Sequence, residues 1–169
     1  MKRARLELLG GFRLSSGDGQ ALDVPARKNR AQLAGLALAP GTATTRDRLV
    51  GLLWSDRGDE QGRNSMRQAL VALRKDLAGL AENPLLLTGD RVALDRRHVS
   101  VDALDLLESS VEGDAAALRQ AASLYRGPLL DGLGSIDAAF EEWLREARAD
   151  LATRAARILG NLAGMSEGA

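Results

Sequence analysis

The sequence predicts a mainly α-helical protein with small β-sheets, built from two parts. Short apolar runs with glycine-rich turns open the chain, and stretches with helical periodicity fill most of the rest. Residues 1–99 hold 17 Lys and Arg against 11 Asp and Glu, whereas residues 100–169 hold 6 against 12. The whole chain has no net charge, but its two stretches carry net charges of about +6 and −6. This asymmetry suggests two modules with different partners. We place the modules at residues 1–98 and 99–169.

The composition limits the class of protein. A chain of 169 residues with 45% hydrophobic content can bury one good core or two small ones. It has no cysteine, and the single histidine, His98, cannot by itself form a zinc site or a catalytic dyad. We therefore expect no enzyme, no catalytic residue, no metal and no cofactor. No apolar run approaches the roughly 20 residues of a membrane span, and MKRARLELLGG lacks a secretory signal, so we expect a cytoplasmic protein without membrane contact.

A small sheet and a helix are predicted first. The run ARLELLGGFRLSSGDGQALDV, residues 4–24, predicts two or three short strands joined by tight turns. A helix is predicted over residues 26–39, and Pro40 and Gly41 end it.

A second helix is predicted over residues 44–54. Thr44 stands three residues before Asp47, which is the spacing of a capping box with an acidic residue in the first turn. The inward face of this helix carries Leu49, Leu52 and Leu53.

A third helix is predicted over residues 60–80, and its two faces differ in kind. Apolar side chains recur at the spacing of a core-facing stripe: Met66, Leu70, Leu73 and Leu77. The opposite face collects cationic and amide side chains: Arg63, Asn64, Arg67, Gln68, Arg74 and Lys75. Asp76 falls toward the flank, so acidic side chains are missing where an ordinary solvated face would include them.

Three acidic residues lie at the start of this helix: Asp56, Asp59 and Glu60. They could be interpreted as a metal site. Helix capping and compensation of the helix dipole explain them more simply.

The stretch NPLLLTGDRVALD, residues 83–95, predicts a β-hairpin with its turn at Thr88, Gly89 and Asp90. Three helices preceded by a small sheet and closed by a hairpin make a winged helix-turn-helix. The third helix of that fold enters the major groove of DNA, and the hairpin contacts the neighbouring backbone or the minor groove.

Several runs, in this order, resemble bacterial transcriptional activators of the antibiotic-regulatory-protein (SARP) type: LGGFRL, RLVGLLW, RNSMRQALVALRKDL and LLLTGDRVALD. The later runs VDALDLLESSVEGDAAALRQAASLYRGPLLDGL and FEEWLREARADL resemble the bacterial transcriptional activator domain (BTAD) of that family. The resemblance covers residues 6–162. It implies a winged helix of response-regulator type, a tetratricopeptide-like helical domain, and an activator that recruits RNA polymerase.

Two features depart from the family pattern. The BTAD usually continues through several helical hairpins, whereas we count roughly three helices here, so the second module is expected to be truncated. The third helix carries Ala69, Val71 and Ala72 where strong DNA readers of this fold often place basic or amide side chains. Base reading is therefore expected to be weak, or to use apolar contact between Val71 and thymine methyl groups.

The chemistry of DNA recognition assigns roles to the polar residues. Arg can bond guanine O6 and N7 together, and Asn or Gln can do the same for adenine. We therefore predict that the bases are read by Arg63, Asn64, Arg67, Gln68 and Val71. We predict phosphate contacts, at the second helix, the end of the third helix and the hairpin, from Thr44, Arg46, Arg48, Arg74, Lys75 and Arg91.

The sequence of the second module predicts pairs of helices that pack as solenoid units. The stretch after residue 113 places Leu118, Ala121, Ala122 and Tyr125 on one face. A long partner helix after residue 136 carries a continuous apolar stripe: Phe140, Leu144, Ala147, Leu151, Ile158 and Leu162. Trp143 is either a core residue, which we favour, or an anchor for a partner. If later hairpins are absent, an apolar edge through Ile158 and Leu162 favours a homodimer.

We therefore interpret the chain as a bacterial transcriptional regulator, an activator without catalysis. Its expected partners are duplex DNA, RNA polymerase or another regulatory protein, and a second copy of the chain. Two alternatives remain open: a protein-interaction module with little DNA affinity, and a regulatory fragment of a larger signalling protein.

Overall fold

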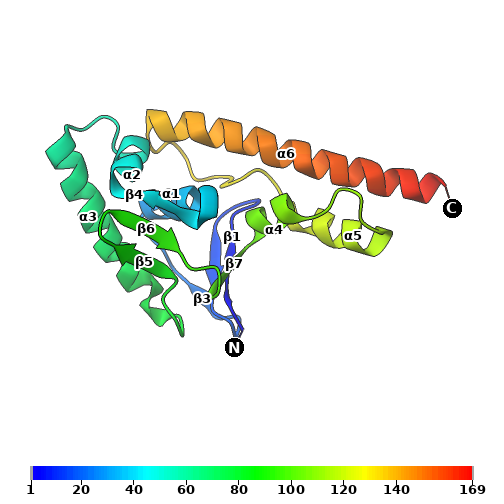
Figure 1. Cartoon of the computed structure of the whole chain (residues 1–169), viewed down its shortest axis with the longest axis horizontal. Helices are drawn as coiled ribbons and strands as arrows, with labels where there is room; N and C mark the ends of the chain where they lie inside the picture. Colours follow the sequence, from blue (N-terminus) through cyan, green and yellow to red (C-terminus); the bar gives the residue numbers. More distant parts are fainter. Residues whose placement is uncertain (1, 169) are drawn as a thin grey trace.

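The structure, a computed structural model, describes residues 2–168 and contains two small sheets and six α-helices (Figure 1). The fold mixes α-helices with small β-sheets, and both kinds of element were predicted from the sequence. The first sheet has the strand order β3-β2-β1-β7. Its strands are β1 (Ala4–Glu7), β2 (Arg13–Ser15), β3 (Ala21–Leu22) and β7 (Val99–Val101). The sequence predicted two or three short strands in the region where β1, β2 and β3 lie, but it did not predict β7, which pairs parallel to β1.

Three helices and a second sheet follow the first three strands. The helices are α1 (Arg27–Ala37), α2 (Arg46–Leu53) and α3 (Asp59–Asp76), with 3₁₀ turns η1 (Pro40–Thr42) and η2 (Leu77–Gly79) after α1 and α3. The second sheet has the order β4-β6-β5, with β4 (Ala43–Thr45), β5 (Leu85–Thr88) and β6 (Arg91–Leu94). Strands β5 and β6 form the predicted hairpin.

The start of α2 differs from the prediction. Thr44 is not the capping residue, because residues 43–45 extend as β4 and Thr44 lies opposite Val92 of β6. Thr45 caps the helix instead, and its hydroxyl oxygen accepts a hydrogen bond of 3.2 Å from the backbone N–H of Arg48. A strand formed with a partner about 50 residues away leaves no local signal, so the sequence pattern placed the cap one residue too early.

Helix α3 buries the predicted stripe. Met66, Leu70 and Leu73 are all at most 2% exposed, and Leu77 is buried in the turn that follows the helix. Gly62 allows α2 to approach, because a Cβ atom there would lie 2.7 Å from a methyl carbon of Val50. The helix begins at Asp59, and Asp59 and Glu60 occupy its first turn, where carboxylates offset the helix dipole.

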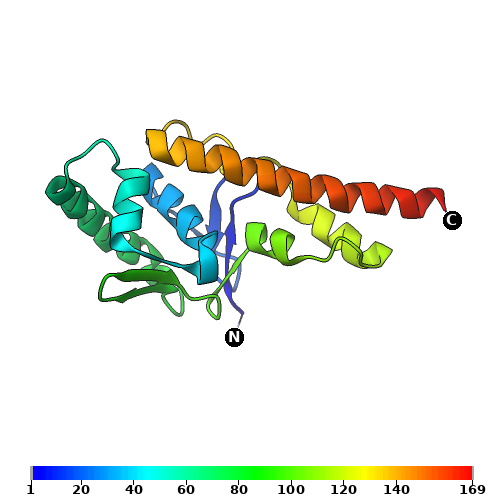
Figure 2. The same ribbon diagram turned by 45° about the horizontal axis from the view of Figure 1, so that its top comes forward.

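Three further helices complete the chain: α4 (Asp102–Glu108), α5 (Ala115–Leu124) and the 30-residue α6 (Ala138–Glu167). Figure 1 shows that α6 begins beside α2 and then runs along α4 and α5. Figure 2, the same ribbon turned by 45°, keeps α6 on one side of the molecule, with α3 at the far end from its C-terminus. The tetratricopeptide-like class of this part stays a prediction.

A backbone connection joins the C-terminal helices to the first sheet. Leu9 and Leu129 form a β-bridge, and the N–H of Leu130 donates to the carbonyl of Leu8 at 2.8 Å. Gly10, at φ 85, lets this segment come close, because a Cβ atom there would lie 3.1 Å from the carbonyl carbon of Arg126. One contiguous set of buried residues runs from β1 to α6. The boundary after residue 98 stays a prediction, and β7 just beyond it belongs to the first sheet.

The exposed apolar side chains of α6 are not the ones that the sequence predicted. Ile158 is fully buried within the chain, because α6 packs against α4 and α5 through this face. The exposed apolar side chains near the end of α6 are instead Leu159 and Met165. Among the described residues, no helix is both long and apolar enough to span a membrane.

Candidate nucleic-acid interface

The face of α3 that points away from the core presents the predicted base-reading residues together. Arg63, Asn64, Arg67 and Gln68 are exposed, and Val71 is 57% exposed. The period of the helix produces this arrangement, because the core takes positions 66, 70 and 73 and leaves the opposite face to solvent. The structure therefore brings these five residues onto one surface.

Two side-chain contacts organise this surface. The guanidinium of Arg67 donates to the side-chain oxygen of Asn64 at 3.1 Å. Arg63 forms an ion pair with Asp47 of α2, with 3.5 Å between Nε and Oδ1. Both partners are more than half exposed, so the pair contributes at most about 1 kcal/mol and leaves Arg63 able to turn to another anion. Sequence reasoning treated Asp47 only as a first-turn acid and missed this contact.

The predicted phosphate-contacting residues fall into two groups. Arg74 and Lys75 are exposed in the last turn of α3. The other group lies where the start of α2 meets the β5–β6 turn: Arg48 is exposed near the start of α2, and Arg91 is exposed opposite Thr45.

Arg46 is held by the hairpin rather than free. Its Nε donates to the carbonyl of Gly89 at 3.1 Å, and its backbone N–H donates to the carbonyl of Asp90 at 2.8 Å. Thr44 lies within β4 and is half-buried. The start of α2 is thus attached to the tip of the hairpin by two hydrogen bonds.

A groove of about 450 Å³ runs between α2 and α3, beside Asp47 and Arg63. Arg57, in the loop before α3, reaches over the groove and donates to the hydroxyl of Ser65 at 3.0 Å. Sequence reasoning missed Arg57, although a basic side chain in the loop before the helix predicted to read bases was a usable signal.

Asp95 stabilises the base of the hairpin through both its backbone and its side chain. The backbone N–H of Asp95 donates to the carbonyl of Pro84 at 2.7 Å and so closes the β5–β6 pair. Hydrogen bonds from Arg97 lower the pKa of the Asp95 carboxyl to about 2, with a further contribution from His98. This carboxylate therefore stays ionised and keeps Arg97 attached at the end of β6.

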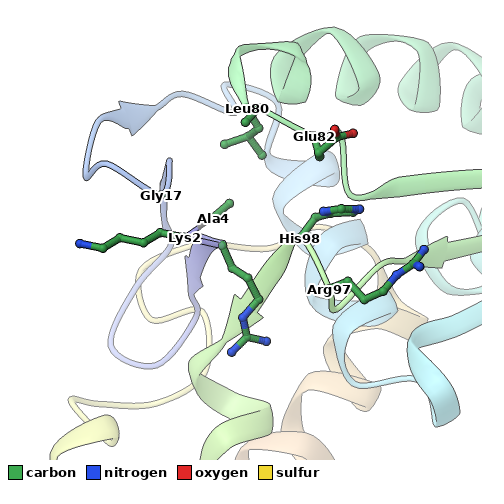
Figure 3. Close-up of a pocket in the computed structure, with 9 residues that line it drawn as sticks. Lys2, Ala4, Gly17, Leu80, Glu82, Arg97 and His98 are labelled. Atoms are coloured by element: carbon green, nitrogen blue, oxygen red, sulfur yellow. The ribbon is translucent and has the colours of Figure 1, made fainter.

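A second basic group of residues, around Lys2, Arg97 and His98, does not form a comparable site. These residues line a pocket of about 40 Å³ between β1, the end of α3 and the segment before β7. Figure 3 shows the side chains of Lys2 and Arg97 pointing in opposite directions, away from the pocket. Their charges therefore do not converge on a common ligand.

The described residues contain no group of three or more His, Asp or Glu side chains placed to hold a metal ion. The surface built by α2, α3 and the hairpin offers instead hydrogen-bond donors and positive charge on a protruding helix. That chemistry suits an extended polyanion.

Comparison with known proteins supports the fold. No family model matches the chain, and no curated protein matches it. Among solved structures, the chain is similar to EmbR of Mycobacterium tuberculosis in complex with a low-affinity phosphopeptide, with a TM-score of 0.69 and 24% identity. The match covers 91% of this chain and 44% of the EmbR chain, so this chain spans less than half of the length of EmbR. The fold described above is therefore one that EmbR also contains.

Proposed function

We propose that the chain is a bacterial transcriptional regulator that binds duplex DNA and carries no catalytic activity. Residues 1–98 act as a winged helix that reads the major groove with α3, and the C-terminal helices act as a BTAD-type module that contacts RNA polymerase or another regulatory protein. The observation that carries the proposal is the exposed row of base-reading side chains on α3, opposite a fully buried stripe. The protein would act in the cytoplasm, where DNA and polymerase are found.

The roles of the side chains follow from their chemistry. Arg67 and Gln68 stand at the middle of the exposed face and are the best candidates to bond base edges, because both can form paired hydrogen bonds. Val71 lies one turn further on, where an apolar side chain fits a thymine methyl group. Arg74 and Lys75 would neutralise phosphates at one side of α3, and Arg48 and Arg91 at the other.

Two further arguments support the activator reading. The SARP-type motifs follow one another along the chain in the family's order, and the fold likeness to EmbR extends over both parts of the chain. A regulator of this type needs one surface for DNA and another for protein, and the opposite net charges of the two parts suit these two partners.

The test is a fluorescence anisotropy titration of duplex DNA from the promoter regions around the natural gene. The double variant Arg67→Ala/Gln68→Ala should weaken binding by about tenfold or more, since a good bidentate base contact discriminates by about 1–3 kcal/mol. The matched control is Arg119→Ala/Gln120→Ala, which removes the same two residue types from an exposed part of α5. Unchanged affinity in the α3 variant, or an equal loss in the control, would refute the proposal.

One observation favours a second candidate, a protein-interaction module with little DNA affinity. Among residues 2–168, Val71 is the most exposed large apolar side chain, and Asp47 places a carboxylate beside Arg63 on the same surface. Apolar and mixed-charge surfaces are typical of protein contacts. The same titration separates the two candidates, because the interaction module would show only weak and unspecific DNA binding.

A further inference from the structure

A second surface lies on the opposite side of α1 from the DNA-reading helix. A pocket of about 200 Å³ opens where the end of α1, the end of α4 and the middle of α6 meet. Its apolar walls come from Leu38, Leu107, Trp143 and Leu151. Leu107 is 37% exposed there and Trp143 is half-buried, so both present apolar surface to solvent. The position joins both parts of the chain, because Leu38 ends α1 and the other residues belong to the C-terminal helices.

The rim of the pocket is acidic. Glu146 and Asp150 lie one turn apart on α6 and are both exposed. Within residues 2–168 neither carboxylate has an ion-pair partner. Arg154, one turn further along α6, is held by the carbonyls of Leu107 and Ser109, to which it donates at 2.7 Å and 2.5 Å. The two carboxylates therefore remain available to a cation from outside.

The walls of the pocket are already held in place. The indole of Trp143 stacks on Phe140, with 5.2 Å between ring centroids, and Phe140 is fully buried. The bonds from Arg154 fix the backbone of Leu107 in the same way. A ligand would meet a preformed apolar surface, so binding would not require the pocket to be ordered first.

We propose that this pocket receives a basic amphipathic helix of a partner protein. One large apolar side chain of that helix enters the pocket, and two Lys or Arg side chains, four residues apart, pair with Glu146 and Asp150. The volume argues for a single side chain of a larger partner, because sites for small molecules usually measure about 300–1,000 Å³. The charges argue for a helix, because carboxylates one turn apart on α6 match cations that repeat at the same pitch of about 5.4 Å on a helix beside it.

The test uses the full chain and a synthetic helix. The probe is a fluorescein-labelled alanine-based peptide of about 16 residues, long enough to be helical, with lysines at positions i and i+4 and a leucine at i+3 on the same face. Binding is followed by anisotropy at low salt. The peptide should bind, its counterpart with glutamates in place of the lysines should not, and replacing its leucine by alanine should weaken binding by about tenfold.

The protein variants locate the binding surface. Glu146→Gln/Asp150→Asn should weaken binding of the lysine peptide by about three- to tenfold, as expected for the loss of two partly exposed ion pairs. The control Glu142→Gln/Glu167→Gln changes net charge equally on exposed positions of α6 outside the pocket, and should stay within about twofold of the unchanged protein. Glu146→Lys/Asp150→Lys should reverse the preference and bind the glutamate peptide.

Several results would overturn the proposal. These are equal binding of the two peptides, an equal loss in the control variant, or no reversal by the lysine substitutions in a protein that remains folded by circular dichroism. A second copy of the chain could also occupy the pocket with the exposed Val71 of its α3 and the basic side chains around it. In that case sedimentation velocity would show a dimer that Glu146→Gln/Asp150→Asn dissociates, and the partner-helix proposal would be wrong.

Discussion

Asp137 accepts two hydrogen bonds from Ser55, one from the backbone N–H at 3.0 Å and one from the hydroxyl at 2.7 Å. The same carboxylate caps α6 by accepting from the N–H of Ala139 at 2.8 Å. Ser55 lies just after α2, where the chain turns toward α3. The start of the C-terminal helix α6 therefore holds the loop that leads into α3.

The first prediction concerns this contact. Asp137→Ala removes a helix cap and leaves two donors of Ser55 without their partner, so it should lower the free energy of unfolding by about 1–3 kcal/mol in urea titrations. The control is Asp114→Ala, which removes the cap of α5 but no contact with the first part of the chain. An equal loss in both variants would mean that the contact with Ser55 contributes nothing.

The stability due to Asp137 should depend on pH in a defined direction. Burial alone would raise the pKa of its carboxyl, but hydrogen bonds from Ser55 and from backbone N–H groups outweigh it and lower the pKa below 3.8. A lowered folded-state pKa stabilises the protein above the usual value and loses that effect as pH falls through the folded value. The difference between the unchanged protein and Asp137→Ala should therefore shrink below about pH 4.

The ion pair between the buried Asp102 and the partly exposed Arg126 gives the second prediction. Asp102 is 3% exposed and accepts hydrogen bonds from the backbone N–H groups of Leu8, Leu9 and Ala103. Arg126 donates to it at 3.0 Å and also pairs with Glu7 at 3.2 Å. Burial raises the pKa of Asp102, while these hydrogen bonds and Arg126 oppose the rise.

Arg126→Ala should destabilise the fold by about 1–3 kcal/mol at pH 7, because it leaves a buried carboxylate without its cation. The pKa of Asp102 should then rise further, and protonation would relieve the unfavourable charge. The loss of stability should therefore diminish as pH is lowered from 7 toward the raised pKa of Asp102, in urea titrations at each pH. Arg119→Ala on the exposed face of α5 is the control and should show neither effect. A loss that does not change with pH would contradict this account.

The sequence was sufficient where the signals are local. The buried stripe of α3 follows from a period of 3.6 residues, and the β5–β6 turn follows from Gly89 and Asp90 between two apolar runs. The five base-reading candidates share a surface for the same reason, because a helix fixes which positions lie opposite its core.

The sequence was insufficient where residues far apart form the contact. Strand β7 pairs with β1 across more than 90 residues, and Ser55 meets Asp137 across 82. Because residues 43–45 form β4, Thr45 caps α2 instead of the predicted Thr44. Because α6 packs on α4 and α5, Ile158 is buried, whereas the sequence pattern predicted it at an exposed edge. A single sequence carries no signal for such pairings, because each residue is compatible with several partners until the chain has folded.

The third prediction separates the two faces of α3. Leu73→Ala removes a fully buried side chain and should lower the free energy of unfolding by about 2–5 kcal/mol. Val71→Ala, two residues away and 57% exposed, should change it by no more than about 0.5 kcal/mol. In anisotropy titrations, Val71→Ala should have the larger direct effect on DNA affinity and weaken binding to sites rich in thymine. Leu73→Ala should reduce DNA binding only by reducing the amount of folded protein. Comparable destabilisation by both changes would mean that the exposed face of α3 also packs against the chain.

The last prediction concerns the phosphate contacts and rests on salt dependence. Each phosphate that a cation neutralises releases counterions, so the logarithm of the binding constant falls with the logarithm of salt concentration by about 0.9 per contact. If some five phosphates are contacted, the slope for the unchanged protein should be roughly −4 to −5. Arg74→Ala should weaken binding to all duplexes alike and reduce the steepness of this slope by about one unit.

The matched control is Arg157→Ala, which removes an exposed arginine on α6 and should leave the slope unchanged. A slope near zero for the unchanged protein would contradict DNA binding through these residues, and an unchanged slope in Arg74→Ala would remove Arg74 from the interface.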